Sequence, residues 1–348
     1  MRLLIITIFL SSLGLPLECH AEVDPYVLSN STADTIETAK SKLHTGEMEL
    51  EYNHKATNID PQTQLILVNQ CQVTARVIWR DDYLYSEYTL QDESTDRDGD
   101  KDAKAISVGW AGPGEVIKTP AFFARTVKNH LWCEYKTKDL QSAANPRYYD
   151  AMRPDKTWFS VSPGDHKNCQ HVTLLTLHES DNRVQTTTVT PVKSHPRRLQ
   201  IVRDYTGKDF QTGFVVDLDQ GGLVVESWNH HPKQNWSGST WDWKQDAHGV
   251  WYASKWTHTV FNRDDLDSVK SHAECVVKSF NSQPTIPANR FEFSSLKLTQ
   301  GTRIEKTTEK GKTITYVGGK PPARNKQKFD LDSLIDESQS GFAAPPEK

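Results

Sequence analysis

The stretch from Gly213 to Phe261 constrains the fold more than any other part of the chain. It opens with two β-rich runs, 213–218 and 223–228, separated by Asp-Gln-Gly-Gly, which is the pattern of a β-hairpin. A third β-rich run covers Val250–Phe261, and six of the ten tryptophans lie between positions 228 and 256. The sequence therefore predicts an antiparallel sheet that carries many aromatic side chains here.

Alternation of apolar and polar residues extends over much of the chain. Met48, Leu50 and Tyr52 alternate with glutamates, which is typical of a strand with one buried and one acidic face. One helix is predicted over Thr32–Leu43, capped by Ser31 or Thr32 and with its apolar residues on one face. We therefore predict an α+β protein, a single domain over residues 22–320, built on a large, mainly antiparallel sheet.

The two ends of the chain are predicted to lie outside this domain. Residues 1–21 have the basic start, apolar centre and small final residue of a secretory signal peptide, so we expect an exported protein, periplasmic or extracellular. Acylation of Cys19 is not expected, because Glu18 stands where a small residue is needed. No later stretch approaches the ~18 apolar residues of a membrane span. Residues 321–348 lose apolar content and are predicted to be a disordered tail.

Four cysteines remain after removal of the signal peptide: Cys71, Cys133, Cys169 and Cys275. An even number in an exported protein permits two disulfides, with three possible connectivities. The alternative is that the thiols are buried and unpaired. The sequence leaves both open, and it contains no Cys-x-x-Cys motif for zinc or redox chemistry.

The run Asp96–Asp102 resembles a calcium loop, because its carboxylates alternate. Its glycine, Gly99, lies too early for an EF-hand loop, and Ser107 stands where the closing glutamate belongs. We therefore predict a mobile acidic loop over residues 91–104 in place of a calcium site.

The chain lacks the motifs of the common catalytic and nucleotide-binding classes, including the nucleophile elbow, the zinc-protease motif, the P-loop and the dinucleotide fingerprint. His230 and His231 are adjacent, so on a strand they point to opposite faces and do not share a metal ion. The net charge of -4 gives no electrostatic argument for nucleic acid. We therefore predict a non-enzymatic protein with no cofactor, no metal and no nucleic-acid partner.

The tryptophans are the better indication of function. Trp236, Trp241 and Trp243 lie among Asn, Ser, Gly, Asp and Lys, which is the composition of a loop or an edge strand. Exposed aromatic rings can stack on sugars or line an apolar pocket. The alternative, which we favour, is that these rings pack into the core or cover a sheet edge. Together with Trp228 and Trp256 they form the candidate ligand-binding set.

The carboxy-terminal half resembles a known superfamily in the order of its motifs. The hairpin over 214–222, the Gly-x-Trp start at Gly249 and a later series of short motifs resemble the LolA/LolB/RseB-like proteins, which are related to periplasmic lipoprotein carriers. The later series comprises Phe280-Asn281, Ile286-Pro287, Phe291-Glu292-Phe293 and Gly301-Thr302. Ala253 stands where that superfamily usually has proline, and this chain is much longer than the carriers.

The resemblance implies an unclosed, strongly curved half-barrel with helices on its concave face. In the carriers that concavity shelters acyl chains, so the leading hypothesis is binding of a lipid, acyl chain or lipoprotein there. A second hypothesis is an envelope interaction or sensing module that binds a protein partner through an exposed Trp-rich surface. A third is a carbohydrate-binding protein, which requires Trp236, Trp241 and Trp243 to lie coplanar in an open groove.

Overall fold

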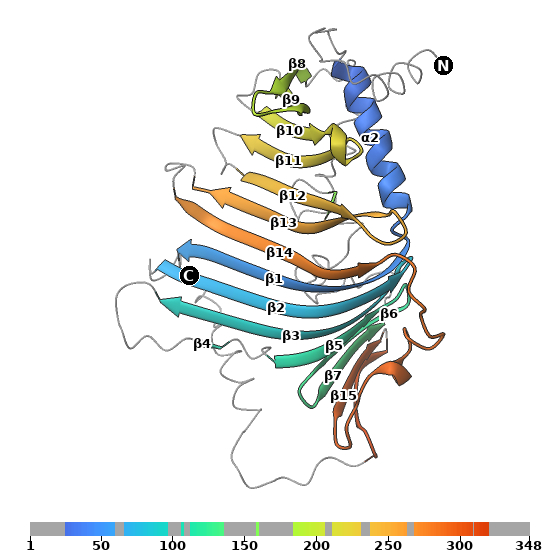
Figure 1. The fold of residues 1–348 in the computed structure, drawn as a ribbon. Coiled ribbons are helices and arrows are strands. Elements are labelled where there is room, and N and C mark those ends of the chain that lie inside the picture. The colour runs from blue at the N-terminus through green and yellow to red at the C-terminus, as the bar shows by residue number, and fades with distance from the viewer. Residues whose placement is uncertain are drawn as a thin grey trace.

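The computed structural model shows one extended, twisted sheet with a helix running across part of it (Figure 1). The structure describes residues 25–59, 66–96, 106–107, 112–135, 158–159, 184–205, 211–230, 237–262, 268–308 and 310–319. The predicted signal peptide over 1–21, residues 97–104 of the acidic loop and the predicted tail over 321–348 lie outside these residues.

The described elements are one α-helix, two short 3-10 helices and the strands of a 16-stranded sheet. The helices are α2 (Pro25–Ser41), η1 (Leu218–Gln220) and η2 (Phe293–Ser295). The strands are β1 (Thr45–Ile59), β2 (Ile66–Arg80), β3 (Tyr83–Asp96), β4 (Ile106–Ser107), β5 (Gly112–Lys118), β6 (Phe122–Val127), β7 (His130–Tyr135), β8 (Val184–Val192), β9 (His195–Tyr205), β10 (Gln211–Asp217), β11 (Leu223–His230), β12 (Ser237–Gln245), β13 (Trp251–Phe261), β14 (Val269–Asn281), β15 (Arg303–Thr308) and β16 (Gly311–Tyr316).

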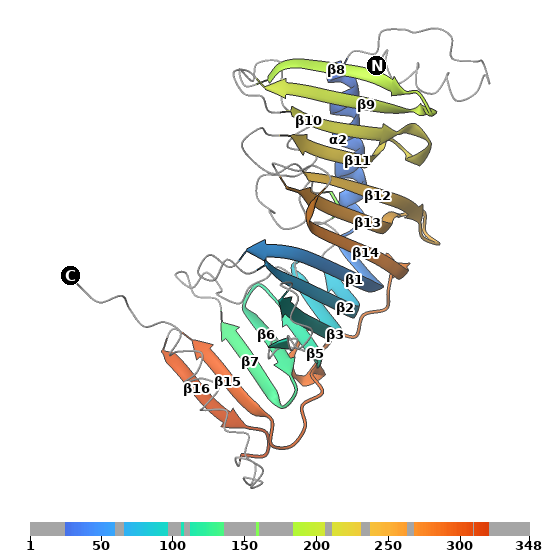
Figure 2. The ribbon, with the colours of Figure 1, turned by 90° about the vertical axis from the view of Figure 1, so that its left-hand side faces the viewer.

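Two meanders meet in the middle of this sheet. The strand order is β16-β15-β7-β6-β5-β3-β2-β1-β14-β13-β12-β11-β10-β9-β8, with β4 paired to β3. The first meander runs from β1 out to β7, and the second starts at the far edge with β8 and returns to pair β14 with β1. The described pairs are antiparallel except for β15 with β7. The predicted fold, a large and mainly antiparallel unclosed sheet, is therefore confirmed, and Figure 2 shows its strong twist.

Strand β1 shows how the sequence divides the sheet into two faces. Met48 is 1% exposed and Leu50 is 3% exposed, whereas Glu47, Glu49 and Glu51 point the other way. We call the side of Met48 and Leu50 the interior face and the side of the glutamates the outer face. Strand β1 extends beyond the predicted alternating segment. Strand β3 is also longer than predicted, because its pairing with β2 continues to Asp96. The predicted acidic loop is therefore wrong for residues 91–96, which pair with β2.

The predicted hairpin is confirmed as β10 and β11. The turn between them contains η1 and is closed by Asp217, whose side chain accepts a hydrogen bond from the Asp219 amide at 2.9 Å. The Gly222 amide donates to the Asp217 carbonyl, also at 2.9 Å. Gly221 has a φ of 70°, a left-handed conformation that suits glycine.

Helix α2 begins earlier than the sequence indicates. It starts at Pro25, so Ser31 and Thr32 lie inside the helix and the predicted cap is wrong. Proline is favourable in the first turn, where its missing amide donor has no intrahelical partner to lose. The predicted apolar face is confirmed, because Ile36 is fully buried and Ala39 is 6% exposed. Figures 1 and 2 show α2 running across the strands from β8 towards β13.

A second, smaller core lies on the outer face at the β5–β7 end. There Ile78, Tyr85 and Ile117 pack against Phe291 and Leu296. The last two residues belong to the irregular segment that precedes β15, so this segment covers the outer face before the chain adds its last two strands. Within the described residues, no helix combines the length and the apolarity needed to cross a membrane.

Two tryptophans lie directly on glycines of the neighbouring strand. Trp228 is opposite Gly213, where an added Cβ would lie 2.1 Å from the indole ring, and Trp79 is opposite Gly46, where it would lie 2.3 Å away. No side chain fits at either glycine unless the ring moves. The missing side chain therefore lets each indole lie flat on the sheet.

We expect Gly213→Ala to lower the free energy of unfolding by about 1–3 kcal/mol, because the new methyl group must displace the Trp228 ring. Urea-induced unfolding measures the change. Gly238→Ala is the matched control, since Gly238 also lies opposite Trp228 and its added Cβ would meet nothing closer than 3.8 Å. Equal effects of the two substitutions would contradict the steric explanation.

Candidate functional site

Three of the five candidate tryptophans lie in the interior of the protein. Trp241, Trp243 and Trp256 are 2%, 5% and 1% exposed and belong to the cluster on the interior face. Trp228 is half-buried against Gly213, and Trp236 lies outside the described residues. The expectation of an exposed Trp-rich surface or a sugar-stacking platform is therefore wrong for Trp241, Trp243 and Trp256, and the alternative of core packing holds for them.

The signal for this burial is present in the sequence. Ser239, Trp241 and Trp243 alternate with three polar residues along β12, and the burial of the strand follows the same alternation. The polar residues between them lie on the outer face, so the polar composition of this segment is that of a strand with one exposed face. The Trp243 indole is also hydrogen-bonded, because its Nε1 donates to the Val224 carbonyl at 2.8 Å.

An aromatic pair that the sequence did not single out completes the interior face. Trp158 is 1% exposed and lies edge-on to Phe280, with ring centroids 5.6 Å apart. Phe159 is fully buried and stacks on Trp243 at 5.4 Å. Tyr252 joins the group by stacking on Phe280 at 4.8 Å. These five rings form what we call the aromatic cluster, at the end of the face nearest the start of β1.

The interior face changes from apolar to polar along the strands. On β1 the series runs from Met48 through Leu50 and Tyr52 to His54. Two neighbouring strands repeat the change in the same spatial direction. They are β12, with Trp243, Trp241 and Ser239 in order, and β13, with Ala253, Trp256 and His258. The face therefore has an aromatic end and a polar end.

The polar end is a single row of residues that lie opposite one another on adjacent strands. From β1 to β11 the row comprises His54, Ala273, His258, Ser239 and Ser227. Directly opposite residues share a face of the sheet, so all five project to the interior side. Ser239 is 1% exposed and Ser227 is fully buried. We call this set the polar row.

The histidine at the centre of the polar row is held neutral. Burial, with smaller contributions from the neighbouring His54 and His272, lowers the pKa of His258 to about 4. Its Nδ1 lies 2.8 Å from the Ser239 hydroxyl. Near neutral pH His258 is therefore a hydrogen-bonding group without charge. No group of three or more metal-ligating side chains occurs among the described residues.

The cysteines in the described part of the chain are thiols. Of the described cysteines, Cys71, Cys133 and Cys275, none is in a disulfide, and all three are buried. Burial raises the pKa of Cys133 to about 11 and that of Cys275 to about 12, so both stay protonated. The alternative of two disulfides is therefore wrong, because three of its four cysteines are unbridged. Cys169 lies outside the described residues.

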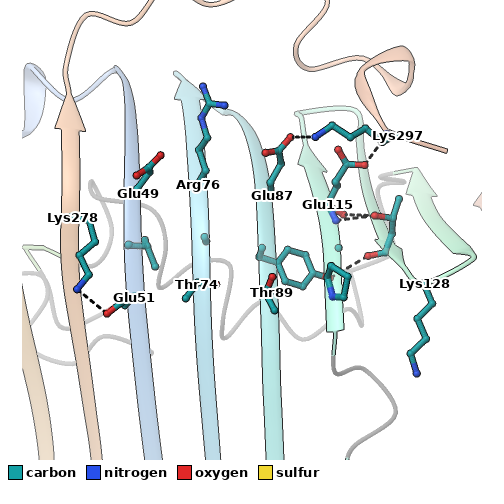
Figure 3. Close-up of a pocket in the computed structure, with 16 residues that line it drawn as sticks. Glu49, Glu51, Thr74, Arg76, Glu87, Thr89, Glu115, Lys128, Lys278 and Lys297 are labelled. Atoms are coloured by element: carbon teal, nitrogen blue, oxygen red, sulfur yellow. Dashed lines mark hydrogen bonds and ion pairs between the residues drawn. The ribbon is translucent and has the colours of Figure 1, made fainter. Parts of the chain in front are cut away.

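The outer face carries a shallow groove of about 630 Å³ over β14, β1, β2, β3 and β5 (Figure 3). Its charged side chains are four acids and four bases, namely Glu49, Glu51, Glu87, Glu115, Arg76, Lys128, Lys278 and Lys297. Several neutralise one another, as in the pairs Lys278–Glu51 at 2.8 Å and Lys297–Glu87 at 2.7 Å. The groove therefore has no net charge with which to select an ion.

Glu115, at the edge of this groove, has a structural role. It is 8% exposed, and its carboxylate accepts hydrogen bonds from the Tyr85 hydroxyl at 2.7 Å and from the Lys297 amide at 2.8 Å. Burial and the bond to Glu115 raise the pKa of Tyr85. The carboxylate thereby attaches the segment before β15 to the sheet. We conclude that the interior face is the better candidate for a functional site.

Neither family models nor curated protein sequences give a match to this chain. Solved structures give distant matches. A LolA superfamily protein from Nitrosomonas europaea is 5% identical with a TM-score of 0.36, and the match covers 76% of this chain and 99% of that one. A DUF1329 family protein from Desulfovibrio piger is 10% identical with a TM-score of 0.33, covering 79% of this chain and 100% of that one.

A third solved structure is a domain described as that of an outer membrane lipoprotein-sorting protein from Vibrio parahaemolyticus. It is 9% identical with a TM-score of 0.34, and the match covers 77% of this chain and 99% of that one. Residue roles do not transfer at TM-scores of this size, so the site is defined by the contacts of this chain alone.

We expect Glu115→Ala to lower the free energy of unfolding by about 1–3 kcal/mol, because the Lys297 backbone amide loses its acceptor and the Tyr85 hydroxyl keeps only Glu87. Glu87→Ala removes the ion pair with Lys297 and one of the two acceptors of Tyr85, which keeps Glu115, so it should cost less, about 1 kcal/mol. Urea unfolding of the two variants compares them. A larger effect of Glu87→Ala would mean that the groove depends on its ion pairs and not on the buried carboxylate.

The lowered pKa of His258 predicts a pH dependence of stability. Between its folded value of about 4 and the ordinary value of 6.5, only the unfolded chain binds the proton. The free energy of unfolding should therefore fall as the pH drops through this window, by up to about 3 kcal/mol. His258→Gln should remove this part of the pH dependence in urea unfolding near pH ~7 and ~5. His248→Gln, at an exposed turn position, should keep it, and equal slopes in both variants would contradict the assignment.

Proposed function

We propose that the protein binds the acyl chain of a lipid or lipoprotein against the interior face of its sheet. The observation that carries the proposal is the continuous cluster of aromatic and aliphatic side chains on the interior face, which ends at the polar row. Its buried residues come from α2 and from strands on both sides of the β1–β14 junction. Such a surface suits an extended apolar ligand, since binding sites for lipids are mostly apolar with a few placed polar groups.

The free energies of burial favour the replacement of α2 side chains on the interior face by an acyl chain. Helix α2 and the turn after it contribute Ala33, Ile36, Ala39 and Leu43 to the interior cluster, of which two are alanines. Burying a large aliphatic side chain stabilises by about 1.5–3 kcal/mol, so parting this cover from the sheet costs on the order of 5 kcal/mol. Ten buried methylene groups of an acyl chain contribute about 8 kcal/mol. A bound chain can therefore offset the displacement of the helix.

The other two functions lose their structural basis. A protein partner recognised through exposed tryptophans and a sugar stacked on a coplanar platform both need Trp241 and Trp243 at the surface, and both residues are buried. Binding without catalysis, in the periplasm or outside the cell, completes the proposal. Export rests on the predicted signal peptide at 1–21, and a single domain over 22–320 is consistent with one sheet that joins β1 to β16.

The direct test is native mass spectrometry of residues 22–348, purified without detergent from an exporting host. We expect a bound lipid or acylated species that is lost on unfolding and is recovered by organic extraction. A ligand-free mass, together with no uptake of an environment-sensitive apolar dye, would overturn the proposal.

Substitution on the two faces locates the site. Trp256→Leu removes an indole that lies 5.8 Å from the Tyr52 ring on the interior face, and should weaken dye binding about tenfold. Phe291→Leu is the matched control, because it removes a buried ring from the smaller core on the outer face. Both variants should lose stability, but only Trp256→Leu should lose affinity. Equal affinities would place the bound dye elsewhere.

A further inference from the structure

We propose that the polar row receives the head of the bound ligand, and that this head is an uncharged hydrogen-bonding group, an ester or a hydroxyl, in place of a free carboxylate. The inference rests on the proposed function and specifies the chemistry of the same site. It is carried by the direction of the interior face and by the hydrogen-bonding state of two side chains in the row.

The direction of the face orients an amphiphile. The aromatic cluster around Phe280 and Trp243 lies at one end, and His54, His258 and Ser239 lie at the other. A chain laid along the strands places its apolar tail on the aromatic cluster only if its head points towards the polar row. The reverse orientation would bury the head among aromatic rings, where a polar group without partners costs free energy.

Two side chains in the row offer hydrogen-bonding atoms to a ligand. The Ser227 hydroxyl is fully buried and, among the residues that the structure describes, has no hydrogen-bond partner. The His258 ring uses Nδ1 towards Ser239, and its Nε2 is a second hydrogen-bonding atom of the same ring. Buried polar groups are normally paired, because an unpaired one costs about 1–3 kcal/mol. An ester or hydroxyl placed between Ser227 and His258 would satisfy both.

The charges around the row exclude an ionised head. From His54 to Ser227 the row contains no lysine, arginine or carboxylate, and its central histidine is neutral near pH ~7. Arg203 on β9 is a buried cation near the row. It lies two strands from Ser227 and two residues after Ile201, the residue opposite Phe214, and it has interactions of its own. A carboxylate at the row would be buried without a counter-charge, which is strongly unfavourable.

The test compares ligands that share a chain and differ in the head. Monodecanoylglycerol, decanol and decanoate each compete with an apolar dye for the full mature protein near neutral pH. We expect both uncharged ligands to bind at least about tenfold more tightly than decanoate. Equal or tighter binding of decanoate would overturn the inference and leave the proposed function standing. If the dye itself does not bind, the proposed function falls and this inference falls with it.

Ser227→Ala tests the row directly. It should weaken monodecanoylglycerol about fivefold and leave the affinity of the apolar dye unchanged. The ligand-free variant should be as stable as the wild type or more stable, because the substitution removes an unpaired hydroxyl. Thr240→Ala is the matched control, since this exposed hydroxyl lies on the outer face beside Ser239. Equal effects of the two substitutions on monodecanoylglycerol would overturn the assignment of the head to this row.

Discussion

The pairing of β1 with β14 is the contact on which the rest of the structure depends. It joins residues 47–56 to residues 271–281, at opposite ends of the two meanders, and without it each meander would be a separate sheet. The pairing also sets the interior face, because Leu50 meets Val277 and Tyr52 meets Cys275 across it. A one-residue slip would turn the apolar side chains of one half away from those of the other. The ligand surface and the fold therefore depend on the same register.

The two faces of the sheet differ in the interactions that their side chains make. On the outer face, acids and bases on adjacent strands form ion pairs, as Lys255 does with Glu274 at 2.6 Å. On the interior face the large rings need room, which Gly46 supplies under Trp79. Unpaired hydrogen-bonding capacity then remains at Ser227, on the interior face. This contrast is the physical reason to look for a ligand there and not in the charged groove.

Local patterns were sufficient to predict individual elements of this fold. The alternation at Met48, Leu50 and Tyr52 and the Gly-Gly turn after Asp219 identify β1 and the β10–β11 hairpin, because both are encoded by neighbouring residues. The β1–β14 junction joins segments more than 200 positions apart, and no short pattern encodes it. The burial of Trp241 and Trp243 agrees with the alternative favoured from the sequence, and the alternation along β12 encodes it, although the polar residues between them are also typical of a loop. Trp158 and Phe159 carry no periodic signal, and only tertiary packing places them on Phe280 and Trp243.

The interior face also separates residues that serve the fold from residues that serve a ligand. Trp256 contributes to both, since its ring is buried among core residues and lies next to the polar row, so its loss affects stability and affinity together. Ser227 differs, because its buried hydroxyl has no partner in the part of the chain that the structure describes, and so it contributes an energetic cost to the ligand-free protein. A natural sequence could avoid that cost with alanine, which occupies the same row at Ala273. A serine at this position is best explained by a hydrogen bond that forms only when the site is filled.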